Sequence, residues 1–226
     1  MKKIGNWNVP DRDINDGKIK EMCNSEMFQC ASALNRAFMY VKNFNTAIDV
    51  GTWIGDSTWL IGNNFNNVIG FEASPLVYEC CIKNLEEKKM DNCRVSNLGL
   101  SNKKDTQYLF NKGKTFSGWI SSLDLTKEQK NSGILVETVR LDDFNFQNID
   151  FIKIDVDSHE GFLLDGARKF LKDNSSVILI EIKKTIHQNR QIEGMPDCFQ
   201  ILEELGYVMV EKVAKWDYVF IKKEQT

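Results

Sequence analysis

One stretch of this sequence decides the fold, Thr46-Ala47-Ile48-Asp49-Val50-Gly51-Thr52-Trp53-Ile54-Gly55-Asp56-Ser57. Its first residues are apolar except for Asp49, and they predict a short buried strand with a carboxylate near its carboxyl end. Gly51 and Gly55 follow, and because a glycine lacks a Cβ, the backbone can turn tightly there and approach a ligand. In open α/β sheets, ligands bind at the carboxyl ends of the strands. The stretch therefore predicts a cofactor loop between a strand and a helix.

Length and charge limit the classes of protein to be considered. The chain has 226 residues, which suits one large domain. Its 29 basic and 32 acidic residues give a net charge of −3, whereas nucleic-acid-binding proteins usually carry a strong basic excess. No apolar run has the length of a membrane span, and no apolar segment follows the N-terminal lysines as a signal peptide requires. We therefore expect neither a nucleic-acid nor a membrane partner.

The cysteines indicate a reduced, cytoplasmic protein. The chain has six cysteines and two histidines, with no C-x-x-C pair and no spacing typical of a zinc site. Disulfide frameworks are typical of smaller secreted domains that are richer in cysteine. We therefore expect free, mostly buried thiols and a cytoplasmic location.

Strand-like and helical patterns alternate along the chain. Short apolar runs predict buried strands at 46–50, 67–72, 93–97, 151–156 and 177–182. Helical spacing of apolar residues lies between several of them, including one helix over 160–171. This order is typical of a parallel sheet.

The two ends of the chain differ from this pattern. Residues 207–213 and 218–221 predict two strands, and their short link favours an antiparallel pair. Residues 25–44 predict a helix, whereas residues 1–24 lack periodicity and predict an irregular arm. We expect a single domain over 1–226, with an arm and helix over 1–45 and a core over 46–226.

Three of the predicted strands end in an acid, namely Asp49, Glu72 and Asp155. A single carboxylate in this position is often structural and held by backbone N–H groups. Three along one sheet edge need polar or cationic partners, because removing a carboxylate from water is costly. A ligand with a ribose, an ammonium group and a positive centre would supply such partners.

The glycine loop differs from the loop of nicotinamide-dependent oxidoreductases. The dinucleotide fingerprint is G-x-G-x-x-G, and its helix N-terminus faces a pyrophosphate. Here three residues separate Gly51 from Gly55, and Asp49 precedes the first glycine. A carboxylate repels a pyrophosphate and attracts a cation, so the loop favours a cationic cofactor.

These residues resemble a known family. Asp49 to Gly55 resembles the first motif of class I S-adenosylmethionine (SAM)-dependent methyltransferases, and Phe71 to Pro75 resembles the second. The order of the later segments is similar to that of the FkbM-type methyltransferases: Asn97-Leu98-Gly99-Leu100-Ser101, Val139-Arg140-Leu141-Asp142-Asp143, Asp150-Phe151-Ile152-Lys153-Ile154-Asp155-Val156, Glu160, Gly166-Ala167 and Leu179-Ile180-Glu181-Ile182. The resemblance implies a Rossmann-like, doubly wound α/β fold with a seven-stranded, mostly parallel sheet, an antiparallel C-terminal strand pair and an N-terminal helical extension.

The resemblance also implies roles at the methionine end of SAM. Gly51 and Gly55 would form the loop around the methionine part, and Asp49 would lie near its amino group. Asp155 would lie beside both the methionine end and the methyl acceptor. The family usually has a Glu-Gly pair where this chain has Asp157-Ser158, a departure on the acceptor side.

Other residues would hold the adenosine part of SAM. By resemblance, Glu72 would bind the ribose hydroxyls, and Ala73 and Ser74 would border the adenine. Asn97 and Leu98 would lie along the adenine edge. The cofactor predicted from the resemblance is therefore SAM.

The reaction gives candidates for a general base. Methyl transfer from a sulfonium is an in-line displacement, and a hydroxyl acceptor also benefits from a base. His159 follows Asp155 in the loop after the central strand and is the first candidate; its alternative role is to pack at the start of the next helix. His187 lies in a polar run and is a weaker candidate.

A metal ion is an alternative aid to catalysis. The acidic residues and the histidine around the central strand could offer ligands to Mg²⁺ or Ca²⁺, and they are Asp155, Asp157, His159, Glu160 and Glu181. Strand and helix geometry would not aim all of them at one point. We therefore expect no metal site.

The resemblance makes O-methylation of a sugar, a glycan or a small metabolite the leading prediction for function. The partner would be that acceptor, and a homo-oligomer is compatible with the sequence. Two other functions stay open: a SAM-binding protein without catalysis, and an NAD-dependent oxidoreductase, against which the glycine spacing argues.

Overall fold

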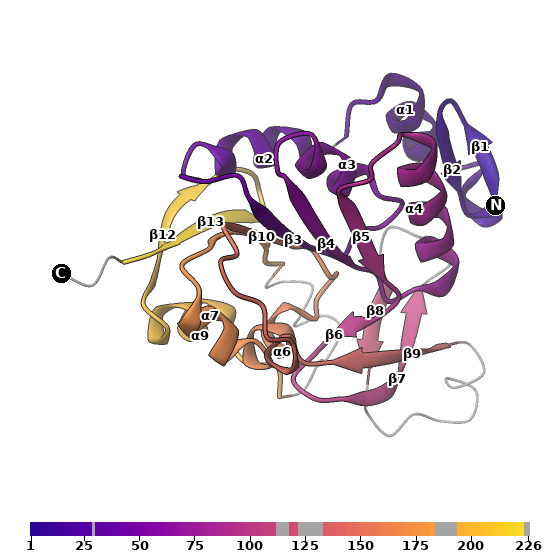
Figure 1. Ribbon diagram of the computed structural model, residues 1–226. Helices are drawn as coiled ribbons and strands as arrows, with labels where there is room; N and C mark the ends of the chain where they lie inside the picture. The colour runs from indigo at the N-terminus through magenta and orange to yellow at the C-terminus, as the bar shows by residue number, and fades with distance from the viewer. Residues whose placement is uncertain (29, 112–117, 122–132, 184–193, 224–226) are drawn as a thin grey trace.

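The structure, a computed structural model, describes residues 1–28, 30–111, 118–121, 133–183 and 194–223. Its centre is a mixed sheet of seven strands with helices on both faces (Figure 1). In spatial order the strands are β12 (Tyr207–Lys212), β13 (Asp217–Lys222), β11 (Val177–Glu181), β10 (Phe151–Ile154), β3 (Thr46–Val50), β4 (Asn67–Phe71) and β5 (Cys93–Ser96). β13 runs antiparallel to both of its neighbours, and the remaining pairs are parallel. The expected α/β class with a mixed sheet is confirmed.

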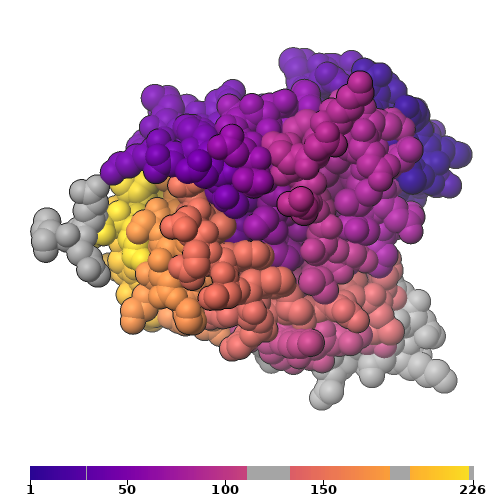
Figure 2. Space-filling view, in the orientation of Figure 1, coloured from indigo at the N-terminus to yellow at the C-terminus, as the bar shows by residue number. Residues whose placement is uncertain are grey.

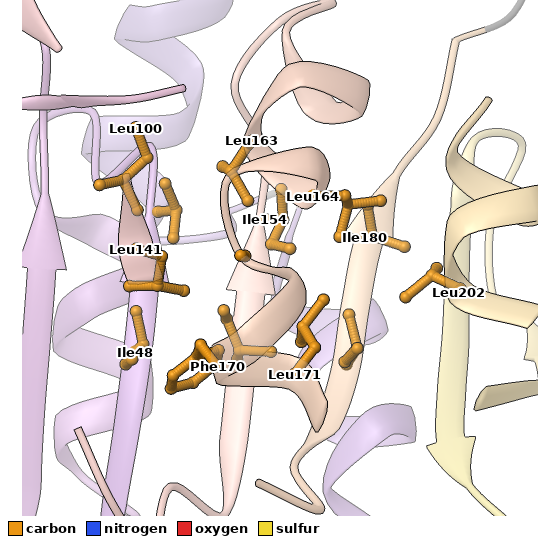
Figure 3. Close-up of a cluster of buried hydrophobic side chains, with 14 of the residues drawn as sticks. Ile48, Leu100, Leu141, Ile154, Leu163, Leu164, Phe170, Leu171, Ile180 and Leu202 are labelled. Carbon is orange, nitrogen blue, oxygen red and sulfur yellow. The ribbon is translucent and has the colours of Figure 1, made fainter. Parts of the chain in front are cut away.

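One face of the sheet carries a large apolar core. Leucine and phenylalanine side chains of three helices pack there on isoleucines of the central strands (Figure 3). The helices are α6 (Glu160–Asp165), α7 (Arg168–Asp173) and α9 (Cys198–Glu204). The labelled side chains that meet are Ile48, Ile154, Ile180, Leu163, Leu164, Phe170, Leu171 and Leu202. Burying each such side chain contributes about 1.5–3 kcal/mol, so this core fixes the position of β3 beside β10.

The opposite face is covered by α2 (Cys30–Phe38) and α3 (Asp56–Gly62). Phe38 packs edge-on against Phe151 of β10, with ring centroids 5.2 Å apart. Because side chains alternate along a strand, Asp49 and Lys153 point to this same face. They are also paired in the register of β3 and β10. A carboxylate and an ammonium group therefore lie side by side in an apolar layer.

The N-terminal region is more regular than expected. The arm predicted as irregular contains a hairpin of β1 (Lys2–Ile4) and β2 (Trp7–Val9), the 3₁₀ helix η1 (Asp11–Asp13) and the helix α1 (Gly17–Ser25). The helix predicted over 25–44 is wrong in its bounds, because α1 ends at Ser25 and α2 covers only Cys30–Phe38. Hairpin strands of three residues are too short for a periodic signal.

The helix predicted over 160–171 is divided into α6 and α7 at Gly166 and Ala167. A Cβ on Gly166 would lie 2.0 Å from the carbonyl oxygen of Ser101, so only glycine allows this close approach. The contact joins the region after β10 to the strand β6 (Gly99–Leu100). The helical pattern of 160–171 did not predict this break, because the contact that causes it is with Ser101, 65 positions earlier in the chain.

A second sheet lies beside the first, at the lower right of Figure 1. Its order is β6, β9 (Ile134–Val139), β7 (Asp105–Asn111) and β8 (Gly118–Ser121). The 3₁₀ helix η2 (Leu141–Asp143) then leads back towards β10. Among the described residues, no helix is long and apolar enough to cross a membrane.

A buried asparagine ties the N-terminal arm to the core. Asn84 lies in α4 (Pro75–Glu87) and is fully buried. Its Oδ1 accepts from the backbone N–H and from Nδ2 of Asn8, at 2.6 and 2.9 Å. Its Nδ2 donates to the carbonyl oxygens of Asn8 and Ile54, each at 2.9 Å. Asn84 thus joins the arm, α4 and the glycine loop; Figure 2 shows the indigo arm packed against the purple and magenta surface.

We expect Asn84→Leu to lower the free energy of unfolding by about 3 kcal/mol, because the change leaves buried groups of Asn8 and Ile54 without partners. Urea unfolding measures the effect. The control is Asn64→Ala, since the side chain of the exposed Asn64 makes a local bond to the carbonyl of Leu60. A loss below about 0.5 kcal/mol for Asn84→Leu would contradict the anchoring role.

Candidate functional site

A cavity lies at the carboxyl ends of β3, β4 and β10. It is lined by residues of the loops that follow these strands and by the start of the segment that follows β5. Six of the residues predicted to touch the cofactor are part of this lining: Gly51, Glu72, Ala73, Ser74, Leu98 and Asp155. The structure therefore brings together residues that are spread over more than 100 positions of the sequence.

Four other predicted residues lie outside the lining, namely Asp49, Gly55, Asn97 and His159. Asn97 lies behind the wall and donates from Nδ2 to the carbonyl oxygens of Glu72 and Ala73, at 2.8 and 3.2 Å. Gly55 starts α3 with a φ of 91°. Both shape the loops of the cavity without touching its surface.

Gly51 lies where the glycine loop meets the end of β10. Its φ is +82°, and a Cβ there would lie 1.8 Å from the carbonyl oxygen of Asp155. No other residue fits this position, because a side chain would force β3 and β10 apart. The backbone N–H of Gly51 donates to the carbonyl oxygen of Phe71 at 2.9 Å, which also fixes the loop to β4.

Asp49 is fully buried behind the cavity wall. Its Oδ2 accepts from the hydroxyls of Ser57 and Thr58, both at 2.7 Å, and these bonds hold the start of α3 against β3. Its Oδ1 lies 3.4 Å from the Nζ of Lys153. In this structure the cation beside Asp49 is therefore Lys153, and the position of Asp49 near the amino group of SAM stays a prediction.

Glu72 connects two loops of the cavity. Its Oε2 accepts from the N–H of Trp53 at 3.0 Å, and its Oε1 accepts from the N–H of Ser74 at 2.9 Å. Burial raises the pKa of Glu72 to about 7, although the two N–H groups act in the opposite direction. Each oxygen keeps a lone pair for a ligand hydroxyl.

Asp155 is a half-buried acid of the site, with 41% of its side chain accessible. Its Oδ2 lies 3.7 Å from the Nζ of Lys153. Burial of the carboxyl disfavours its charge, but Lys153 and then Lys183 outweigh this effect, so the pKa of Asp155 lies below its ordinary value. Asp155 is therefore an ionised carboxylate on the cavity wall at neutral pH.

His159 lies away from the cavity. It is the N-cap residue of α6, its ring is buried against Phe162, and its Nε2 lies 2.9 Å from the Oγ of Ser101. Burial lowers the pKa of His159 to about 4, so the ring is neutral. The geometry gives this residue the packing role rather than contact with an acceptor in the cavity, and His187 lies outside the described residues.

Three of the acids considered as metal ligands do converge. Carboxylate oxygens of Asp155, Asp157 and Glu181 lie within 4.8 Å of one another. The Nζ of Lys183 contacts Glu181 and lies 3.3 Å from Asp157, so a lysine supplies positive charge to this group. Glu160 instead accepts from the N–H of Ser158, and His159 bonds to Ser101.

Asp157 and Ser158, which depart from the family pattern after β10, have an unusual backbone conformation. Asp157 and Ser158 have φ values of 50° and 85°, in the left-handed region that favours glycine. Ser158 therefore adopts a conformation that costs about 1 kcal/mol or more for a residue with a Cβ. The strained loop directly follows Asp155 and carries Asp157 to the cavity wall.

Sequence reasoning missed a large part of the lining, including Lys153, Arg12 and Met22. Lys153 lines the cavity from β10, and Arg12 and Met22 reach it from the N-terminal arm. A lysine in the apolar run of β10 was a usable signal, because a buried cation requires an acid opposite it. The arm residues gave no signal, since their position depends on how the arm folds over α4.

Comparison with known proteins identifies the family. Residues 49–209 match the family model described as the methyltransferase FkbM domain, which is more than half of the chain. The chain belongs to the FkbM methyltransferase family. Membership identifies SAM as the methyl donor. A search of curated proteins found no match.

Solved structures show the same fold. A methyltransferase FkbM from Methylobacillus flagellatus is 14% identical with a TM-score of 0.50, and the alignment covers 95% of this chain and 48% of that one. This FkbM chain thus spans about half the length of that relative. A SAM-dependent O-methyltransferase from Thermotoga maritima is 12% identical (TM-score 0.52, coverage 92% and 72%). A SAM-dependent methyltransferase from Aquifex aeolicus is 15% identical (TM-score 0.50, coverage 90% and 96%).

The raised pKa of Glu72 predicts a pH dependence of stability in the ligand-free protein. Between pH 4.5 and 7 the folded state binds a proton at Glu72 that the unfolded state releases, so stability falls as the pH rises through this window. We expect Glu72→Gln to remove this decrease, which is on the order of 3 kcal/mol. Urea unfolding from pH 4.5 to 8 measures it.

The control for this experiment is Glu21→Gln on the exposed side of α1. It should leave the pH profile of the wild-type protein unchanged. Identical profiles for wild type and Glu72→Gln would show that burial does not raise the pKa of Glu72.

Proposed function

We propose that this protein is an O-methyltransferase that transfers the methyl group of SAM to a hydroxyl of a sugar, a glycan or a small metabolite. The observation that carries the proposal is the position of Asp155, an ionised and accessible carboxylate on the wall of a cavity formed by strand ends. We also propose that residues 1–45 and 46–226 act as one domain, since Asn84 joins them and both line the cavity.

The residues of the cavity fit SAM. Glu72 presents two carboxylate oxygens with free lone pairs, which suit two ribose hydroxyls. Ala73, Ser74 and Leu98 form a mostly small and apolar wall beside it, which suits an adenine. Gly51 leaves backbone exposed to the methionine part where a Cβ would not fit. When bound, SAM supplies a methyl group on a positively charged sulfur. This sulfur is the leaving group when an acceptor oxygen takes the methyl group.

Asp155 would receive the proton of the acceptor. With SAM in the cavity as the source of the methyl group and its sulfur as the leaving group, the acceptor hydroxyl would pass its proton to the Asp155 carboxylate as its oxygen takes up the methyl group. A positioned base of this kind contributes about 10²–10⁴-fold to a rate. Holding acceptor and donor in line supplies the remaining acceleration.

Radiolabelled SAM with a panel of sugars, phenols and amines tests the proposal. We expect label on a hydroxyl compound, and we expect Asp155→Asn to lower kcat about 100-fold with little change in SAM affinity. Asp91→Asn, at an exposed site outside the cavity, is the matched control. Transfer to amines only would contradict O-methylation, and SAM binding with no transfer to any compound would favour a binding protein without catalysis.

Calorimetry tests the ribose contact separately. We expect Glu72→Ala to weaken SAM affinity at least 10-fold, because two ribose hydroxyls lose their acceptor. The exposed Glu21→Ala is the control. Unchanged affinity in Glu72→Ala would overturn this assignment.

A further inference from the structure

The ammonium group of Lys153 lies between two carboxylates and the glycine loop. The residue is 4% exposed, although it lines the cavity. Its Nζ lies 3.4 Å from Oδ1 of Asp49 and 3.7 Å from Oδ2 of Asp155, and it donates to the carbonyl oxygen of Gly51 at 3.3 Å. The lysine thus bridges the ends of β3 and β10 at the point where the cavity begins.

The three charges are arranged in order of exposure. Asp49 is 0% exposed, the Lys153 side chain is 6% exposed, and the Asp155 side chain is 41% exposed. Asp49 neutralises the ammonium group from behind, so the three groups together present one net negative charge, on Asp155, to the cavity. A net negative charge is favourable beside a cationic sulfonium, whereas an unneutralised lysine would repel it.

Other titratable groups surround this arrangement. They are Cys30 of α2, Asp56 of α3, Glu72 after β4, Asp157 after β10, Glu181 of β11, Lys183 after β11 and Asp217 of β13. Of these groups, Lys183 favours charge on Asp155 through its positive charge, and Glu181 favours it through a side-chain hydrogen bond. Lys183 is already in contact with Glu181 and Asp157. Lys153 is therefore the cation whose removal should change the ionisation of Asp155 most.

We propose that Lys153 is a positioning residue of the methyl-transfer site, which holds the Asp155 carboxylate ionised and in place at the cavity wall. The proposal rests on the proposed function, because Asp155 is the base of that reaction. It also gives Asp49 a role, which is to neutralise Lys153 rather than to touch the ligand.

Direct titration of Asp155 tests the ionisation. Lys153→Met alone leaves the buried Asp49 charge unpaired and can prevent folding, so the test compares Asp49→Asn with the double variant Asp49→Asn/Lys153→Met. An asparagine at position 49 still accepts from Ser57 and Thr58. In carbon-13 NMR with labelled aspartate, assigned through Asp155→Asn, we expect the pKa of Asp155 to be about one unit or more higher in the double variant. Equal values in the two proteins would overturn the proposal.

The matched control is Lys222→Met. The Nζ of Lys222 donates to the carbonyl oxygens of Leu171, Lys172 and Asn174 at the end of α7, so this lysine is also structural but does not line the cavity. The variant should lower stability and leave the titration of Asp155 unchanged. A shift of the same size in Lys222→Met would show that the effect is not specific to Lys153.

Kinetics with the acceptor found by the radiolabel panel test the consequence for the reaction. Because the ionised form of Asp155 is the active one, a higher pKa moves the acidic limb of the kcat profile to higher pH. The acidic limb of the kcat profile should therefore lie about one pH unit or more higher in the double variant than in Asp49→Asn, with KM for SAM within a few-fold. An identical pH profile in both proteins would overturn the proposal. If the wild-type protein transfers no methyl group, the proposed function fails, and the NMR titration still decides the role of Lys153.

Discussion

The pairing of β3 with β10 is the constraint on which the site depends. Their register places Asp49 opposite Lys153 on a face that is otherwise apolar. A buried charge without a partner costs several kcal/mol, so a shift of one residue in this register would be strongly disfavoured. The same pairing brings the backbone of Gly51 against Asp155, which leaves no space for a side chain. The glycine loop, the start of α3 and the cavity wall are thus held by one arrangement.

Glu72 and Asp155 have opposite environments, although each follows a strand of the same sheet. Glu72 accepts from two backbone N–H groups, but burial outweighs them and its pKa rises to about 7. Asp155 has ammonium groups beside it, and its pKa falls. The same sheet edge therefore holds one acid whose charge is disfavoured and another whose charge is favoured. Divergent environments of this kind commonly separate the tasks of two carboxylates in an active site.

Local pattern was sufficient to predict the central strands and the acids at their ends, because an apolar run that ends in a carboxylate is visible in a few residues. Properties that depend on residues far away in the chain could not be predicted from local sequence. The face to which Asp49 points follows from its register with Lys153, more than 100 positions later. The break between α6 and α7 depends on Ser101, and the position of His159 away from the cavity depends on its bond to the same serine. SAM could be predicted because the motifs that resemble the family are contiguous, whereas the distances that join Lys153 to Asp49 and Asp155 depend on the fold.

The bonds between Asn8 and Asn84 join residues that are 76 positions apart. During synthesis, the arm therefore leaves the ribosome well before the helix on which it docks, and its apolar residues, such as Trp7, stay without their final cover until α4 is complete. Contacts of such sequence separation slow folding, because a long loop must close before they form. Since Arg12 and Met22 belong to this segment, we expect the cavity at the strand ends to be complete only after one of the slower steps of folding.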